Sequence, residues 1–163
     1  MKISALRCAG FALLFVFFAG IAAGADHVTR EQDFVLSDLH GSKVALASFL
    51  DNKRPVLLFF WTTWCPYCLK DMKNIDRLAA EYKDAVTILA INAGEDKRDV
   101  ERVVRNYGVK TIVLIDPAQT ATEGFHVIGV PTFVLINGAG DIEVNDNYFP
   151  EKEIRALAGE RKS

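Results

Sequence analysis

Uninterrupted apolar runs alternate along this chain with segments of helical periodicity. The run at residues 55–61 begins at a proline and is apolar throughout, which predicts a buried strand. In the next segment the apolar positions recur at intervals of three and four residues, at Cys68, Met72, Ile75, Ala79 and Tyr82. This spacing puts them on one face and predicts a helix over residues 70–82.

The same patterns predict elements along the rest of the chain. Strands at 33–36 and 43–46 form a hairpin, with Gly41 supplying the positive φ of its turn. Further elements follow in order: a short helix or turn at 47–52, a strand at 85–91, a helix at 96–107 closed by Gly108, a strand at 111–115, a helix at 118–124, a strand hairpin of 132–136 with 141–144, and a terminal helix at 150–157. Strands that alternate with helices predict an α/β fold with a mainly parallel sheet covered on both faces, to which the last hairpin adds antiparallel edges.

Length and composition narrow the picture. A chain of 163 residues, half of them apolar, is enough for one domain with a substantial core. The net charge of −2 gives no reason to expect nucleic acid as a partner.

The first 25 residues have the pattern of a secretory signal. Lys2 and Arg7 precede an apolar run at 9–23, and Ala23-Gly24-Ala25 forms a small-residue cleavage site. We expect a signal peptide at 1–25, with an uncleaved membrane anchor as the alternative, and one exported domain over residues 26–163. The expected location is periplasmic or otherwise extracytoplasmic. Cleavage would also remove Cys8, the only cysteine besides Cys65 and Cys68.

Cys65 and Cys68 lie where the strand at 55–61 gives way to a helix. A helix N-terminus carries partial positive charge and unpaired N–H groups, so it stabilises a thiolate there, and the thiolate is the reactive form. Cys68, one turn further on, can reach Cys65. A zinc site needs about four ligands, yet the sequence has no second CxxC and its three histidines are scattered. A purely structural bridge closing so short a loop would constrain the unfolded chain little. The spacing therefore favours a redox-active dithiol/disulfide pair.

Two blocks of sequence give a family resemblance. Residues 56–68 resemble the active-site block of the thioredoxin fold, and residues 128–133 (Ile-Gly-Val-Pro-Thr-Phe) resemble its cis-proline loop. More narrowly, the chain is similar to the exported thiol-disulfide oxidoreductases of the TlpA/ResA type. It shares a leading hairpin with Asp-Leu-His-Gly at 38–41 and an extra helix and strand at 96–115. Over residues 33–157 the resemblance implies a thioredoxin fold: a central mixed sheet flanked by helices, with an N-terminal hairpin and a helix–strand insert.

The resemblance also implies roles for the cysteines and the proline loop. Cys65 resembles the exposed nucleophile that attacks a partner disulfide, and Cys68 the thiol that resolves the mixed disulfide. Pro131 resembles the cis-proline opposite the pair, where it would present the backbone of Val130 to an extended substrate segment. Trp64 is expected to pack beside Cys65 and shield it.

The residues between and after the cysteines complete the expected site. Pro66 removes a backbone N–H from the helix start, and Tyr67 adds an aromatic contact surface. Relatives of this type often carry Glu-Met-Pro where this chain has Asp71-Met72-Lys73. Asp71 is either a partly buried carboxyl that shuttles a proton or a solvated acid that favours the helix dipole. Thioredoxins proper carry a buried Asp in the strand, whereas Phe59 occupies that position here, so that proton relay is absent.

The leading hypothesis is an extracytoplasmic thiol-disulfide oxidoreductase without a cofactor. The resemblance favours reduction of selected protein disulfides, such as those of cytochrome c haem-site cysteines or a metal-site assembly protein, with electrons from a membrane thiol carrier. One alternative is a peroxiredoxin-type peroxidase, since Thr62 precedes Cys65 by three residues, although Leu58 stands where that family has Pro. The other is a non-enzymatic copper-binding assembly protein, which would need His126 as a ligand beside the two cysteines.

Overall fold

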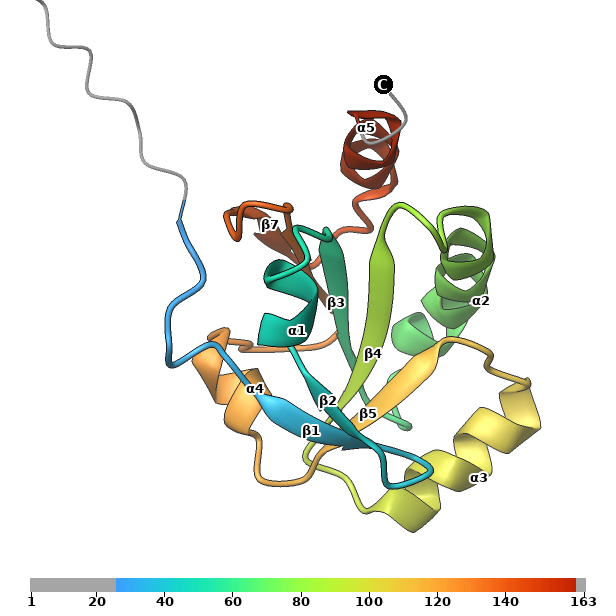
Figure 1. The fold of residues 1–163 in the computed structure, drawn as a ribbon. Coiled ribbons are helices and arrows are strands. Elements are labelled where there is room, and N and C mark those ends of the chain that lie inside the picture. Colours follow the sequence, from blue (N-terminus) through green and yellow to red (C-terminus); the bar gives the residue numbers. More distant parts are fainter. Residues whose placement is uncertain (1–25, 161–163) are drawn as a thin grey trace, which may run out of the picture.

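The computed structural model describes residues 26–160, which form a seven-stranded sheet with helices on both faces (Figure 1). The strands are β1 (Val35–Asp38), β2 (Lys43–Ala45), β3 (Val56–Trp61), β4 (Thr87–Ala93), β5 (Ile112–Asp116), β6 (Thr132–Ile136) and β7 (Ile142–Asp146). The helices are α1 (Ala47–Leu50), α2 (Pro66–Glu81), α3 (Lys97–Tyr107), α4 (Thr120–Gly124) and α5 (Glu151–Glu160). The predicted signal segment, residues 1–25, lies outside this described part.

The strand order is β2-β1-β5-β4-β3-β6-β7. Only β3–β4 and β4–β5 are parallel, and the other four pairings are antiparallel. The expected mixed sheet with an N-terminal hairpin and a helix–strand insert is confirmed, but the expectation that the sheet is mainly parallel is wrong. The parallel trio is flanked on both sides by antiparallel strands, because β1 runs against β5 and β6 runs against β3.

Each face of the sheet has its own apolar core. Alternate residues of β3, namely Leu57, Phe59 and Trp61, pack with α2, α3 and α5, while Val56, Leu58 and Phe60 face the side of α1 and α4. In Figure 1, α2 and α3 lie on one side of the strands and α1 and α4 on the other. Both faces of β3 are therefore covered, which explains why its six residues are all apolar and all buried.

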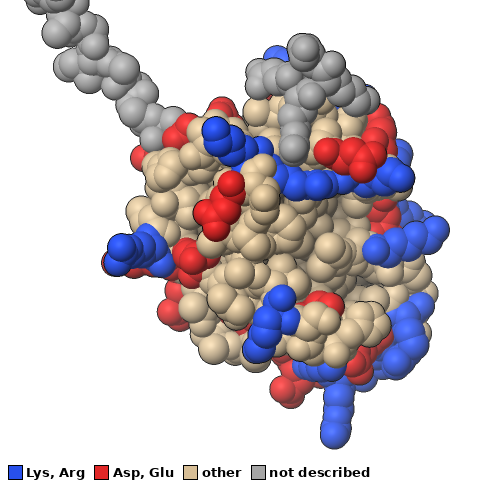
Figure 2. Space-filling view, viewed as in Figure 1, with Lys and Arg blue, Asp and Glu red and all other residues tan. Residues whose placement is uncertain are grey.

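The charged side chains of both signs are interspersed on the face shown in Figure 2, around an uncharged central area. Among residues 26–160, none of the helices has both the length and the apolar character that crossing a membrane requires.

Helix α2 begins at Pro66, four residues before the predicted start at Lys70. A proline is favoured at the first helical position because its fixed φ suits the helix and its missing N–H would have had no partner there. The predicted turn glycines are confirmed, since Gly41 has φ +89° and Gly108, which ends α3, has φ +65°. The early start of α2 places Cys65 at its N-cap and Cys68 in its first turn.

Asp76 connects the middle of α2 to the two residues that precede β5. Its carboxylate accepts hydrogen bonds from the backbone N–H of Lys110 (3.1 Å), from the N–H of Thr111 (2.8 Å) and from the Thr111 hydroxyl (2.6 Å). These bonds tie together two elements that are separated by β4 and α3 in the chain. They also fix the helix that carries the cysteines relative to the sheet.

Replacing Asp76 by alanine should therefore weaken the fold. The change leaves two backbone N–H groups and a hydroxyl without their acceptor, and we expect a loss of about 1–3 kcal/mol in the free energy of unfolding. Urea unfolding of D76A and of the exposed control D84A measures it. A D76A chain as stable as D84A would contradict this account of the α2–β5 connection.

Candidate active site

Cys65 is the N-cap residue of α2, at the carboxyl edge of the parallel strands. Its Sγ accepts a hydrogen bond from the backbone N–H of Cys68 at 3.1 Å, and Pro66 occupies the first helical position. The first turn of α2 holds no acidic residue. Within the helix itself no first-turn carboxylate opposes the positive end, and the one N–H bond already present would stabilise negative charge on Cys65.

Cys65 and Cys68 form a disulfide, with their Cα atoms 5.3 Å apart. Both are buried, because Cys65 is 3% exposed and Cys68 is fully covered. The expectation of an exposed nucleophile is wrong for this oxidised form. The sulfur packs with the core on the α2 side of the sheet, and the carbonyl oxygen of Val130 lies 3.8 Å from Cys65 Sγ.

The Val130–Pro131 peptide bond is cis, as the sequence resemblance implied. Hydrogen bonds hold the loop in place from both sides. The Thr132 hydroxyl donates to the carbonyl of Gly129 at 2.6 Å, and the Asn147 amide donates to the carbonyl of Pro131 at 2.6 Å. The backbone that faces the disulfide is therefore fixed by its neighbours in β6 and in the segment after β7.

Apolar side chains stand out around this buried disulfide. Trp64 and Tyr67 are each 72% exposed, and Ile128, two residues before Val130, is fully exposed. Tyr67 is exposed, as a contact residue would be, whereas Trp64, which was expected to pack beside Cys65 and shield it, has most of its surface in solvent. Ile128 is the first residue of the predicted cis-proline block, but it was not among the predicted site residues. The arrangement gives a partner polypeptide an apolar rim around a covered sulfur.

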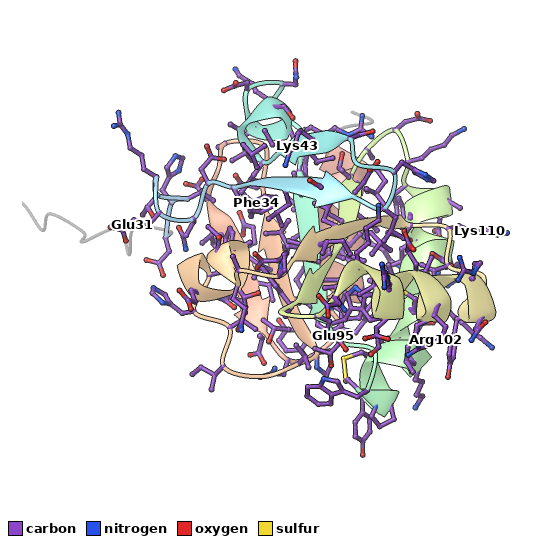
Figure 3. All side chains as sticks on the ribbon, turned by 90° about the horizontal axis from the view of Figure 1, so that it is seen from below. Glu31, Phe34, Lys43, Glu95, Arg102 and Lys110 are labelled. Carbon is purple, nitrogen blue, oxygen red and sulfur yellow. A yellow bond between two sulfur atoms is a disulfide. The ribbon has the colours of Figure 1, made fainter. Side chains whose placement is uncertain are left out.

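Glu95 supports the loop that leads into the active site. Its carboxylate accepts the Thr63 N–H at 2.7 Å, the Thr63 hydroxyl at 2.5 Å and the Asn92 amide at 2.7 Å. In the view of Figure 3, Glu95 and the yellow disulfide bond appear toward the same edge of the molecule. Glu95 was not among the predicted site residues. The sequence signal for it was a polar pair, Asn92 and Glu95, after the predicted apolar strand at 85–91, which places the pair at the same sheet edge as Cys65.

Asp71 is half-buried on α2, one turn after Cys68. Burial raises the pKa of its carboxyl above the ordinary value, although the positive charge of Lys70 acts in the opposite direction. The position is thus the partly buried one that a proton-transfer role requires, and the raised pKa makes this carboxyl a better proton acceptor than a solvated one.

The copper-binding alternative finds no ligand group in the described structure. Within residues 26–160, no group of three or more His, Cys, Asp or Glu side chains is placed to hold a metal ion. His126 instead lines a small pocket with residues 127–129 and 145–147. Leu58, which stands where peroxiredoxins carry Pro, lies inside the buried strand β3. Phe59, which stands where thioredoxins carry a buried Asp, stacks on Phe133 with ring centroids 5.0 Å apart.

A disulfide at the start of a helix, faced by a cis-proline loop on a central mixed sheet, defines a thiol-disulfide oxidoreductase of the thioredoxin fold. Comparison with known sequences agrees. The family model described as AhpC/TSA family matches residues 29–145. The thiol-disulfide oxidoreductase ResA of Halalkalibacterium halodurans is 34% identical over 87% of this chain and 82% of its own length, and ResA of Bacillus subtilis is 30% identical over 80% and 74%. The chain belongs to the AhpC/TSA family, among its ResA-like members.

Solved structures agree on the fold. A secreted disulfide oxidoreductase of Mycobacterium tuberculosis, homologous to DsbE of E. coli, superposes with a TM-score of 0.68 at 24% identity, covering 80% of this chain and 97% of that one. The exposed lipoprotein thioredoxin Etrx1 of Streptococcus pneumoniae gives 0.68 at 25% identity, covering 78% and 98%. The predicted fold class and enzyme class are confirmed.

The Glu95 contacts predict a cost for removing this carboxylate. In E95A the Thr63 N–H and the Asn92 amide lose their acceptor, and we expect the free energy of unfolding to fall by about 1–3 kcal/mol. The exposed control E123A should change it by less than about 0.5 kcal/mol. Urea unfolding compares the two, and equal stabilities would show that Glu95 does not support the loop.

The raised pKa of Asp71 predicts a pH-dependent stability difference. Because the folded chain holds this proton more tightly than the unfolded chain, whose Asp pKa is about 3.9, ionisation of Asp71 destabilises the fold. D71N lacks this ionisation. Its advantage over the wild type should be absent below pH about 3, grow as pH rises from about 4 to the raised pKa, and then stay constant.

Urea unfolding of the wild type and D71N at several pH values follows this difference. A wild type that gains stability over D71N as pH rises would mean that the folded protein lowers the pKa of Asp71 instead.

Proposed function

We propose that this chain is an extracytoplasmic oxidoreductase that uses Cys65 and Cys68 to reduce selected protein disulfides. The observation that carries the proposal is the placement of Cys65 Sγ at the N-cap of α2, with the Cys68 N–H as donor and the Val130 carbonyl opposite. Pro66 cannot supply a second donor. A dithiol whose thiolate is only moderately stabilised is a better reductant than one with strongly stabilised thiolate, and this supports the reducing direction.

In the proposed reaction, the Cys65 thiolate attacks one sulfur of the partner disulfide. The partner S–S bond breaks, one partner sulfur leaves as a thiolate, and a mixed disulfide joins Cys65 to the other. Cys68, deprotonated with Asp71 as acceptor, then attacks Cys65 Sγ. The partner leaves with both sulfurs reduced, and the Cys65–Cys68 disulfide holds the oxidation until a donor returns two electrons.

The cis-proline loop and the apolar rim are proposed to hold the partner during this exchange. An extended partner segment would pair with the backbone of Val130 beside Pro131, as in strand addition. Trp64, Pro66 and Tyr67 would cover it from the α2 side, since two of them are exposed aromatics that contribute contact area at low entropy cost.

The location and partners are part of the same proposal. The Lys2–Arg7 start, the apolar run and the Ala-Gly-Ala site support export of residues 26–163, with residues 1–25 as a cleaved signal or a membrane anchor. The similar Mycobacterium tuberculosis oxidoreductase is described as secreted. Substrates would be oxidised cysteine pairs of exported proteins, such as the haem-site cysteines of apo-cytochrome c or a metal-site assembly protein. A membrane thiol carrier would supply the electrons.

Trapping tests the proposal. In C68S the resolving thiol is gone, so Cys65 should remain in a mixed disulfide with its partner. The C68S chain, exported with its own N-terminal segment, should give adducts on non-reducing gels that dithiothreitol removes. The matched variant C65S should give none. Adducts of equal abundance with C65S, or none with C68S while the wild type also fails to reduce insulin, would refute the assigned roles.

A further inference from the structure

A groove of about 330 Å³ lies along the first two turns of α2. It is lined by Pro66, Leu69, Lys70, Lys73 and Tyr107. Pro66 directly follows Cys65 in the chain, so one end of the groove lies one residue from the reactive cysteine. Tyr107, the last residue of α3, forms the far wall and is 53% exposed. A polypeptide held at Cys65 can therefore extend into this groove.

The groove combines an apolar floor with a cationic rim. Leu69 is half-buried against the core, while Lys70 and Lys73 are exposed. Within residues 26–160, neither lysine has a carboxylate within salt-bridge distance, whereas the cations of α3 at Lys97 and Arg102 are paired with acids of their own helix. Asp71 is the only acid in the first two turns of α2, and it is half-buried. The positive end of the helix adds to the same field.

This charge is local, since the chain as a whole has a net charge of −2. Two ammonium groups without a salt bridge, over an apolar floor, match a segment that carries a carboxylate next to an apolar side chain. We infer that this groove selects partner proteins with an acidic residue close to the cysteine that Cys65 engages. The inference rests on the proposed function and names the substrate chemistry that it prefers.

Chain geometry sets the position of that acidic residue. Lys70 and Lys73 lie five and eight residues after Cys65, which corresponds to about 7–12 Å along a helix axis. An extended partner advances about 3.3 Å per residue. The carboxylate therefore belongs about two to four residues from the partner cysteine.

Two synthetic peptides test this preference. Each carries one cysteine as a mixed disulfide with 2-thiopyridine, and they differ only in having Asp or Ser three residues from the cysteine. The reduced protein attacks the peptide sulfur through Cys65, the peptide–pyridine S–S bond breaks, and 2-thiopyridone leaves. Its absorbance gives the second-order rate constant in stopped flow. Cys68 then releases the peptide as a free thiol.

The wild type should react about tenfold faster with the Asp peptide than with the Ser peptide at low salt. Each exposed charge pair accounts for about two- to fivefold. The preference should shrink at 0.5 M NaCl, since about that much salt screens exposed charges over a few ångströms. In K70S/K73S the ratio should fall below about twofold, while K152S on α5 keeps it. K73E should favour a third peptide with Lys at the variable position.

The outcomes separate the inference from the function on which it rests. Equal rates for the Asp and Ser peptides with the wild type would overturn the inference and leave the exchange activity intact. A K70S/K73S variant that slows both peptides equally would also overturn it, because the lysines would then act on the Cys65 thiolate instead of on the partner. No reaction with any peptide would refute the proposed function itself.

Discussion

The antiparallel pairing of β6 with β3 is the constraint on which the active site depends. Because β6 runs against β3, the start of β6 meets the end of β3, with Thr132 opposite Phe60. The residues before Thr132 are the cis-proline loop, and the residues after Phe60 lead into Cys65. Two segments about 65 positions apart in the chain are thereby brought to one edge of the sheet, where the Val130 carbonyl covers the Cys65 sulfur.

The site combines a buried sulfur with an exposed apolar rim. The helix start supplies a fixed N–H donor to Cys65, and Glu95 and Asn147 hold the two loops that meet there. The side chains of Trp64, Tyr67 and Ile128 face solvent instead. Hydrogen bonds inside the protein thus fix the segments around the disulfide, while the exposed surface beside it is apolar.

Most helices and strands could be predicted from the sequence, because the spacing of apolar residues within one segment reflects which of its faces is buried. The run at 55–61 predicted β3, and the three-and-four spacing predicted α2 except for its first turn, where Pro66 stabilises the start without adding periodicity. The resemblance located Pro131 and its cis bond. Strand direction was not predictable in this way, since an apolar strand has the same composition in either direction, and the sheet proved less parallel than expected.

Contacts between residues far apart in the chain, at the edge of the sheet, also could not be predicted from the sequence. Glu95 lies 32 residues after Thr63, and only the side-by-side placement of β3 and β4 brings them together. The contact of Cys65 with the Val130 carbonyl likewise joins residues 65 positions apart. Asp71 was accessible to sequence reasoning because its environment is set by its own helix, one turn from Cys68.

The strands at the two margins of the sheet bear on how the protein avoids unwanted self-association. β2 has only three residues and begins with the exposed Lys43, while β7 carries exposed polar and acidic side chains at Glu143, Asn145 and Asp146. Short or charged margins discourage another chain from continuing the hydrogen-bond ladder there. Both margins of the sheet thus disfavour edge-to-edge pairing with another chain.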